Sequence, residues 1–189
     1  MTRVLRLAAV LGVTALLALG LGHVFGHLTR VVYPIFLVPI AMGALAGLLA
    51  GFLAHFAGLR TRTAVVVVAL FGWIAAVAAF HRAERRAFVE LQAHLAAAEG
   101  VVTTESPEAS ADRVLIRATG HEGFLGFAIF RVQSGVGLRL WPGLGRSAWA
   151  GGLVWAAELA LGLSVCLSLA LRVIRAQPGA GLTAGSANR

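Results

Sequence analysis

The sequence predicts an all-α membrane protein with four transmembrane helices and one extramembrane segment between the third and fourth helices. Of the 189 residues, 59% are hydrophobic and only 13% are charged, whereas soluble domains carry about 25% charged residues. The apolar residues gather in four long runs, and a helix that crosses a bilayer needs about 20 of them. Arginine residues flank these runs and do not enter them, as is typical of membrane proteins.

The charge composition argues against a nucleic-acid partner. The net charge is +8, and all 16 basic residues are arginine. These arginines are scattered along the chain, whereas a nucleic-acid-binding surface would cluster them on one soluble face. The single cysteine, Cys166, cannot form a disulfide within the chain.

The sequence contains none of the common catalytic or cofactor-binding motifs. It has no Cys/His cluster with zinc spacing, no Walker loop, no G-x-S-x-G and no H-E-x-x-H. We therefore predict no catalytic residue and no cofactor, and an enzyme is the least favoured class.

The first transmembrane helix is predicted at residues 5–28. A cleaved signal peptide is the alternative, because Arg3 and Arg6 precede the apolar run and residues 18–20 could form a cleavage site. We favour a retained helix, because the apolar character continues to Leu28 and further spans follow after short loops.

His23 and His27 are four residues apart in this run and therefore share one helix face. Such a pair could bind a metal or haem. No third ligand is recognisable nearby, so these histidines are weak candidates and we predict no metal.

The second span, residues 33–57, carries a row of glycines. Gly43, Gly47 and Gly51 recur at four-residue steps. In lipid, close backbone contact between small residues drives helix pairing. This row is therefore predicted to be a helix-packing face, and Pro39 is expected to kink the helix.

The third span, residues 63–80, is predicted to continue directly into a charged extramembrane helix, because helix-forming residues follow it. The extramembrane segment as a whole covers residues 81–146. Within it, residues 100–112 lack apolar periodicity and are predicted to be a loop.

The part of this segment before the last span is rich in glycine and aromatic residues, and two structures are open. One is a pair of short strands that includes residues 114–119. The other is a short interfacial helix over residues 124–134 that ends at Gly135. We favour the helix, because residues 124–130 are too apolar for a free loop.

The last span, residues 147–171, contains Glu158, the only acid inside any of the four runs. An ionisable group in a bilayer costs roughly 2.5 kcal/mol or more, so it marks a candidate functional site. The span also has small residues at every fourth position, including Gly152, Ala156 and Ala160, which predict a packing face. At 100° per residue, Ala156 and Ala160 point away from Glu158, so we expect two different neighbours.

Three roles are open for Glu158. It could form a hydrogen bond between helices, worth roughly 1 kcal/mol. It could instead serve as a proton relay or ion site, or as a counter-charge for an arginine of another subunit. Thr14 and Ser164 are the candidate hydroxyl partners within the chain.

The order of these features resembles that of a set of bacterial four-span membrane proteins. Tyr33, Pro34 and Pro39 lead into a glycine-rich second span, and the segment GFLGFAIFRVQSG precedes a last span that bears the acid Glu158. The resemblance implies four spans and transfers no catalytic or binding residue.

Arginines in the short flanks predict that both termini are cytoplasmic in a bacterial inner (plasma) membrane. Residues 172–189 turn to proline, glycine, alanine and serine and are predicted to be disordered. We expect a non-enzymatic scaffold or accessory subunit that lies in the lipid bilayer and associates with a membrane-protein partner or with copies of itself. The alternative is a proton- or ion-coupled transporter or channel subunit that uses Glu158.

Overall fold

The computed structural model describes residues 2–29, 36–59, 61–98, 105–134 and 148–176, and all secondary-structure elements in this part of the chain are helices. The predicted all-helical class is thereby confirmed for the described residues. Four helices are long and apolar enough to cross a membrane. They are α1 (Arg3–Leu28), α2 (Leu37–Phe56), α3 (Arg62–Ala98) and α6 (Ala148–Arg175).

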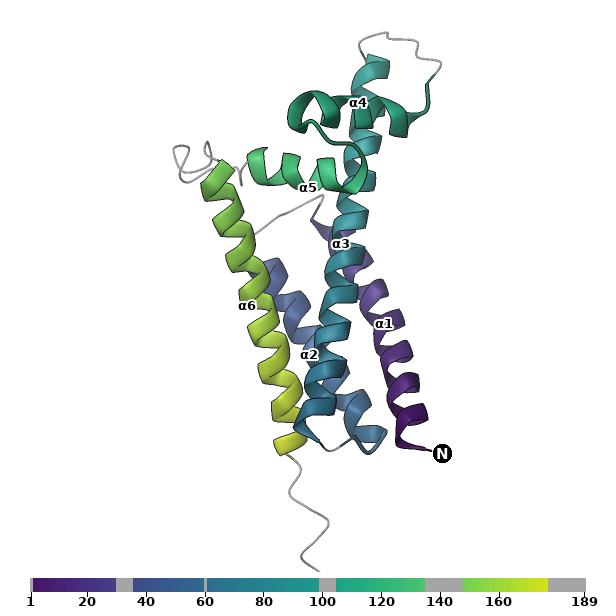
Figure 1. Cartoon of the computed structure of the whole chain (residues 1–189), viewed down its shortest axis with the longest axis vertical. Coiled ribbons are helices and arrows are strands. Elements are labelled where there is room, and N and C mark those ends of the chain that lie inside the picture. Colours follow the sequence, from purple (N-terminus) through teal and green to yellow (C-terminus); the bar gives the residue numbers. More distant parts are fainter. Residues whose placement is uncertain (1, 30–35, 60, 99–104, 135–147, 177–189) are drawn as a thin grey trace, which may run out of the picture.

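These four helices form a bundle in which α1 packs along α3 and α2 packs along α6 (Figure 1). The start of α1 and the end of α6 lie at the same end of the bundle (Figure 1), as four crossings require. Helix α6 continues to Arg175, so the first residues of the expected disordered tail are helical. Residues 177–189 of that tail lie outside the described residues.

Glycines set the contact between α2 and α6. A methyl group added to Gly43 would collide with the carbonyl oxygen of Gly162, and one added to Gly47 would collide with that of Cys166. One added to Gly51 would lie 3.0 Å from the carbonyl oxygen of Ala170. The contact advances by four residues on both helices at each step, so the two helices run parallel with their backbones close together.

Helix α1 is held against α3 by a similar row that the sequence analysis did not identify. Its buried residues fall at every fourth position. A methyl group on Gly22 would collide with the carbonyl oxygen of Ala76, and one on Gly26 would collide with the Ala83 side chain. The whole row consists of Val10, Thr14, Ala18, Gly22 and Gly26.

Helix α3 is continuous over 37 residues, and its second half extends beyond the bundle to carry α4 (Pro107–Thr119) (Figure 1). An ion pair fixes α4 there, with Arg85 Nη2 3.0 Å from Asp112 Oδ1. The same oxygen accepts a hydrogen bond of 3.1 Å from the Gly123 N–H, where α5 (Gly123–Ser134) begins. Asp112 therefore joins α3, α4 and the start of α5.

The prediction of a loop over residues 100–112 is wrong for residues 107–112, because they lie in α4. The alternative prediction of a strand over residues 114–119 is wrong for the same reason. The helix has standard start and stop signals. The Ser106 hydroxyl accepts a hydrogen bond from the Ala109 N–H at 3.2 Å, and Pro107 occupies the first turn. Gly120 ends the helix with a φ of 77°.

Helix α4 buries only Ala111 and Leu115, so few apolar residues in its sequence indicate a helix. Most of its other side chains are exposed or only partly buried. The helix predicted over residues 124–134, by contrast, is confirmed, since α5 covers these residues. It rests on α3 through aromatic contacts, with the Phe88 ring centroid 5.8 Å from Phe127 and 5.4 Å from Phe130.

The glycine contacts predict a sharp difference between two Gly→Ala substitutions. Gly43→Ala should lower the free energy of unfolding by about 1–3 kcal/mol, because the methyl group has no room against α6. Gly20→Ala is the matched control, since nothing lies within 4 Å of that position and alanine favours the helix. SDS-induced unfolding in mixed micelles, followed by circular dichroism, measures both. Equal stability of the two variants would contradict the close contact.

Candidate functional site

Glu158 lies inside the bundle, between α6 and the start of α2. The whole residue is 2% exposed. The Phe36 N–H donates to Glu158 Oε1 at 3.1 Å. Phe36 is the residue before α2 and has a φ of 68°, a conformation that residues other than glycine rarely adopt. The carboxyl group therefore satisfies an N–H at the end of α2 that has no partner within the helix.

The face of α6 that carries Glu158 is the face that meets the glycine row of α2. Glu158, Gly162 and Cys166 are all buried, and the last two contact Gly43 and Gly47. The helical angle separates Glu158 from Ala156 and Ala160, but it does not decide which face of α6 meets α2. The deciding factor is Gly162, which shares the face with Glu158.

Neither hydroxyl proposed as a partner of Glu158 takes that role. The Thr14 hydroxyl lies on α1 without a hydrogen-bond partner, where its methyl group faces Gly72 of α3. The Ser164 hydroxyl donates to the carbonyl oxygen of Ala160 at 2.7 Å, within its own helix. Glu158 instead accepts from the backbone N–H of Phe36, and no side-chain pattern in the sequence indicates such a bond.

Most of the small residues predicted to pack on α6 do not face another described helix. Ala156 and Ala160 are exposed. Gly152 is half-buried, and a methyl group there would lie 3.4 Å from Val132 Cγ1 of α5. Within the described residues, therefore, Ala156 and Ala160 form no helix contact, while Gly43, Gly47 and Gly51 do.

His23 and His27 lie side by side on the surface of α1. Their Nε2 atoms are 3.2 Å apart and their ring centroids 4.5 Å apart. Across the described residues, no group of three or more His, Cys, Asp or Glu side chains is placed to hold a metal ion. The pair is thus brought together as the spacing predicts, but without a third ligand from that part of the chain.

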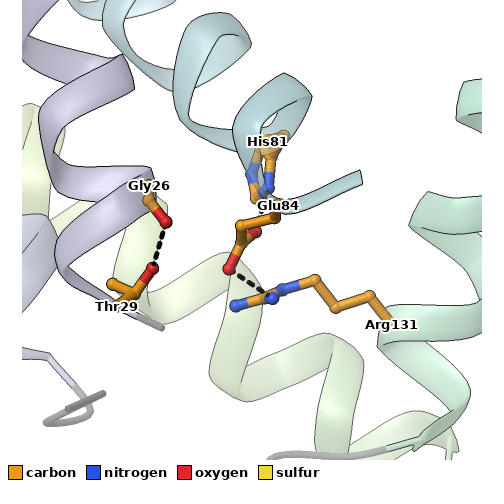
Figure 2. Close-up of polar contacts among 5 residues, drawn as sticks. All are labelled: Gly26, Thr29, His81, Glu84 and Arg131. Atoms are coloured by element: carbon orange, nitrogen blue, oxygen red, sulfur yellow. Dashed lines mark hydrogen bonds and ion pairs between the residues drawn. The ribbon is translucent and has the colours of Figure 1, made fainter. Parts of the chain in front are cut away.

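A second polar cluster, which the sequence analysis missed, lies where α3 leaves the bundle. Glu84 of α3 is its centre, with Oε2 3.0 Å from His81 Nδ1 and Oε1 2.6 Å from Arg131 Nη1. Figure 2 shows the Arg131 side chain reaching Glu84 from α5. The side chains of His81 and Glu84 are 9% and 10% exposed, so this cluster, unlike a surface ion pair, is largely shielded from water.

The spacing of His81 and Glu84, three residues apart on a helix, is visible in the sequence and places them on one face. Arg131 is 47 residues further along, and no local pattern links it to them. The position of α5 across the space between α3 and α6 (Figure 1) decides that contact.

An apolar cavity of about 390 Å³ opens beside this cluster. It lies between α3, α5 and α6, and its volume falls within the range of small-molecule sites, roughly 300–1,000 Å³. Its walls are aromatic and aliphatic, with His81 and Arg131 as the polar exceptions. The residues that bear on its chemistry are Trp73, His81, Phe127, Ala128, Arg131 and Trp155.

No protein family, no curated protein and no solved structure matches this chain. The resemblance to bacterial four-span proteins therefore rests on the sequence features alone.

The contact at the start of α2 predicts different outcomes for two Glu158 variants. Glu158→Leu should lower the free energy of unfolding by about 1–3 kcal/mol, because the partly buried Phe36 N–H loses its acceptor. Glu158→Gln retains a carbonyl oxygen that can accept the bond, so it should lower the free energy of unfolding clearly less. SDS-induced unfolding in mixed micelles measures the stability of both variants. Equal losses would show that the acceptor is not what matters at this position.

The shielded cluster also predicts a difference between two glutamates. Glu84→Gln should destabilise the protein by about 1–3 kcal/mol, because it weakens bonds to a charged partner in a shielded site. Glu105→Gln is the control, since Glu105 pairs with Arg113 where both side chains are about half exposed, and such pairs contribute at most about 1 kcal/mol. Thermal unfolding followed by circular dichroism distinguishes them, and a larger loss at Glu105 would contradict this ranking.

Proposed function

We propose that the chain is an integral membrane protein without catalytic activity that serves as a scaffold or accessory subunit. Four helices of sufficient length and apolar character support its insertion in a bilayer. The arginines that flank the short loops favour cytoplasmic termini, and the bacterial inner membrane is the location that the sequence features fit. The acid buried among the spans, Glu158, takes part in a structural bond with the Phe36 N–H.

The observation that carries the proposal is the exposed small-residue face of α6. Ala156, Ala160, Ser164 and Ser168 are all exposed, and they follow one another at four-residue steps. Small side chains leave the backbone accessible, which favours close approach of another helix in lipid. The opposite face of α6 is already occupied by α2. We therefore assign this second face to a transmembrane helix of another protein or of a second copy of the chain.

The transporter alternative has less support. The void beside Glu158 has a volume of about 10 Å³, roughly the space of one water molecule. Glu158 itself is 2% exposed and holds the start of α2. A proton or ion route through this residue would require the bond between Glu158 and the start of α2 to break.

Cysteine cross-linking tests the proposed face. In a Cys166→Ala background, we expect Ala160→Cys to give one discrete product in native membranes. Oxidation would join two copies of the chain through a disulfide between the cysteines introduced at position 160. A photoreactive group attached to the thiol would cross-link the chain to a different protein. Leu161→Cys is the control, because Leu161 is exposed but turned about 100° away on the helix.

A discrete product at position 160 and none above background at position 161 would support the proposal. Equal labelling at both positions, or labelling of lipid alone, would contradict it.

A further inference from the structure

The cavity between α3, α5 and α6 has features of a ligand site that the proposed scaffold role does not explain. It is almost entirely apolar, and it lies where α5 crosses between α3 and α6 (Figure 1). Ile74 and Phe124, which line it, are 63% and 52% exposed. These side chains border an open side that an alkyl chain can enter from the surrounding lipid. The volume of about 390 Å³ is near the lower end for small-molecule sites, which suits one alkyl chain.

A small void, lined mostly by apolar side chains, adjoins the cavity. It has a volume of about 10 Å³, which matches a single water-sized group. Glu158 of α6 and Pro39 of α2 contribute to its walls. Four residues line both spaces, namely Val77, His81, Trp155 and Leu159. The two spaces together therefore offer room for a chain and for one small polar group.

Two buried nitrogen atoms at this junction have no hydrogen-bond partner. They are His81 Nε2 and Trp155 Nε1. The whole His81 residue is only 7% exposed, and its ring centroid is 5.7 Å from that of Trp155. A buried polar atom left unpaired costs about 1–3 kcal/mol, so a ligand that satisfies both atoms gains affinity.

The chemistry of the two nitrogens defines the group that fits. The indole N–H can only donate. The carboxylate of Glu84 accepts from His81 Nδ1, so in the neutral imidazole Nε2 bears the lone pair and accepts. A hydroxyl group matches this arrangement, because its oxygen accepts from Trp155 while its hydrogen is donated to His81. A methyl ether has no hydrogen for His81.

The charges nearby favour an uncharged head group. Arg131 is paired with Glu84 at 2.6 Å, so its positive charge is balanced within the cluster. With His81 neutral, Arg131 and Glu84 together carry no net charge, and the carboxyl group of Glu158 in the wall of the small void disfavours an anionic head group. We propose that this site binds an uncharged amphiphile with one alkyl chain, its chain in the cavity and its hydroxyl group between His81 Nε2 and Trp155 Nε1.

Tryptophan fluorescence provides a direct binding assay, since Trp73 and Trp155 both line the cavity. For this assay the full chain is purified with the substitutions Trp141→Phe and Trp149→Phe, so that Trp73 and Trp155 are the only tryptophans. Added 11,12-dibromododecan-1-ol should quench them in a saturable way. Unbrominated dodecan-1-ol should relieve the quenching, and dodecyl methyl ether should require about tenfold more, the cost of one lost hydrogen bond.

Two kinds of variant separate the head group from the chain. Trp155→Phe keeps a ring in place and leaves Trp73 as the reporter, and it should reduce the tenfold preference for the alcohol to about twofold. His81→Leu should do the same. Ala128→Phe fills the cavity and should abolish saturable quenching, whereas Ala157→Phe, on the exposed side of α6, should leave it unchanged. Circular dichroism and elution volume verify the fold of each variant.

Three results would overturn the proposal. Dodecanoate displacing the probe as well as dodecan-1-ol would indicate a site for anions. Equal displacement by the alcohol and the ether would show that no hydroxyl bond forms. Quenching that is not saturable, or that survives Ala128→Phe, would show that the brominated chain only dissolves in the surrounding lipid or detergent.

Discussion

The close approach of three helices at Gly162 is the constraint on which much of the structure depends. A methyl group at this position would collide with the Trp73 ring of α3 and would lie 2.8 Å from the Pro39 carbonyl oxygen of α2. The lack of a side chain there lets α2, α3 and α6 meet at one level of the bundle. Helices in lipid gain little from burying apolar surface against each other, so such backbone proximity is the main source of their attachment.

That contact also sets the register that makes Glu158 a structural residue. Glu158 precedes Gly162 by one helical turn, and Phe36 precedes Pro39 by nearly one turn on a parallel helix. Once Gly162 rests on the start of α2, the carboxyl group is brought to the Phe36 N–H, 3.1 Å away. The acid in the last span is therefore placed to accept a bond from the backbone at the start of a helix. Its burial follows from the glycine contact that lies beside it.

Beyond this level α3 and α6 separate, and α5 crosses the space between them (Figure 1). Trp73 takes part in both regions, since it packs on Gly162 and also lines the cavity. The bonds of Glu84 to His81 and Arg131 then hold α5 in place. One consequence is a wall with two unsatisfied nitrogens, His81 Nε2 and Trp155 Nε1, next to apolar space. Tight packing at one level and separation at the next thus produce both the rigid core and the candidate ligand site.

The sequence alone determined the helical class, the four long apolar runs and the glycine row of α2, because these depend on local composition and on a period of about 3.6 residues. It also contained the cap signals of α4, Ser106, Pro107 and Gly120, although the apolar pattern used to find helices did not reveal them. Only the tertiary structure decided that the acid-bearing face of α6 meets α2, that Arg131 reaches Glu84, and that Glu158 accepts a bond from the Phe36 N–H. Each of these contacts joins residues far apart in the chain, and their register follows from the packing of whole helices, which no local pattern encodes.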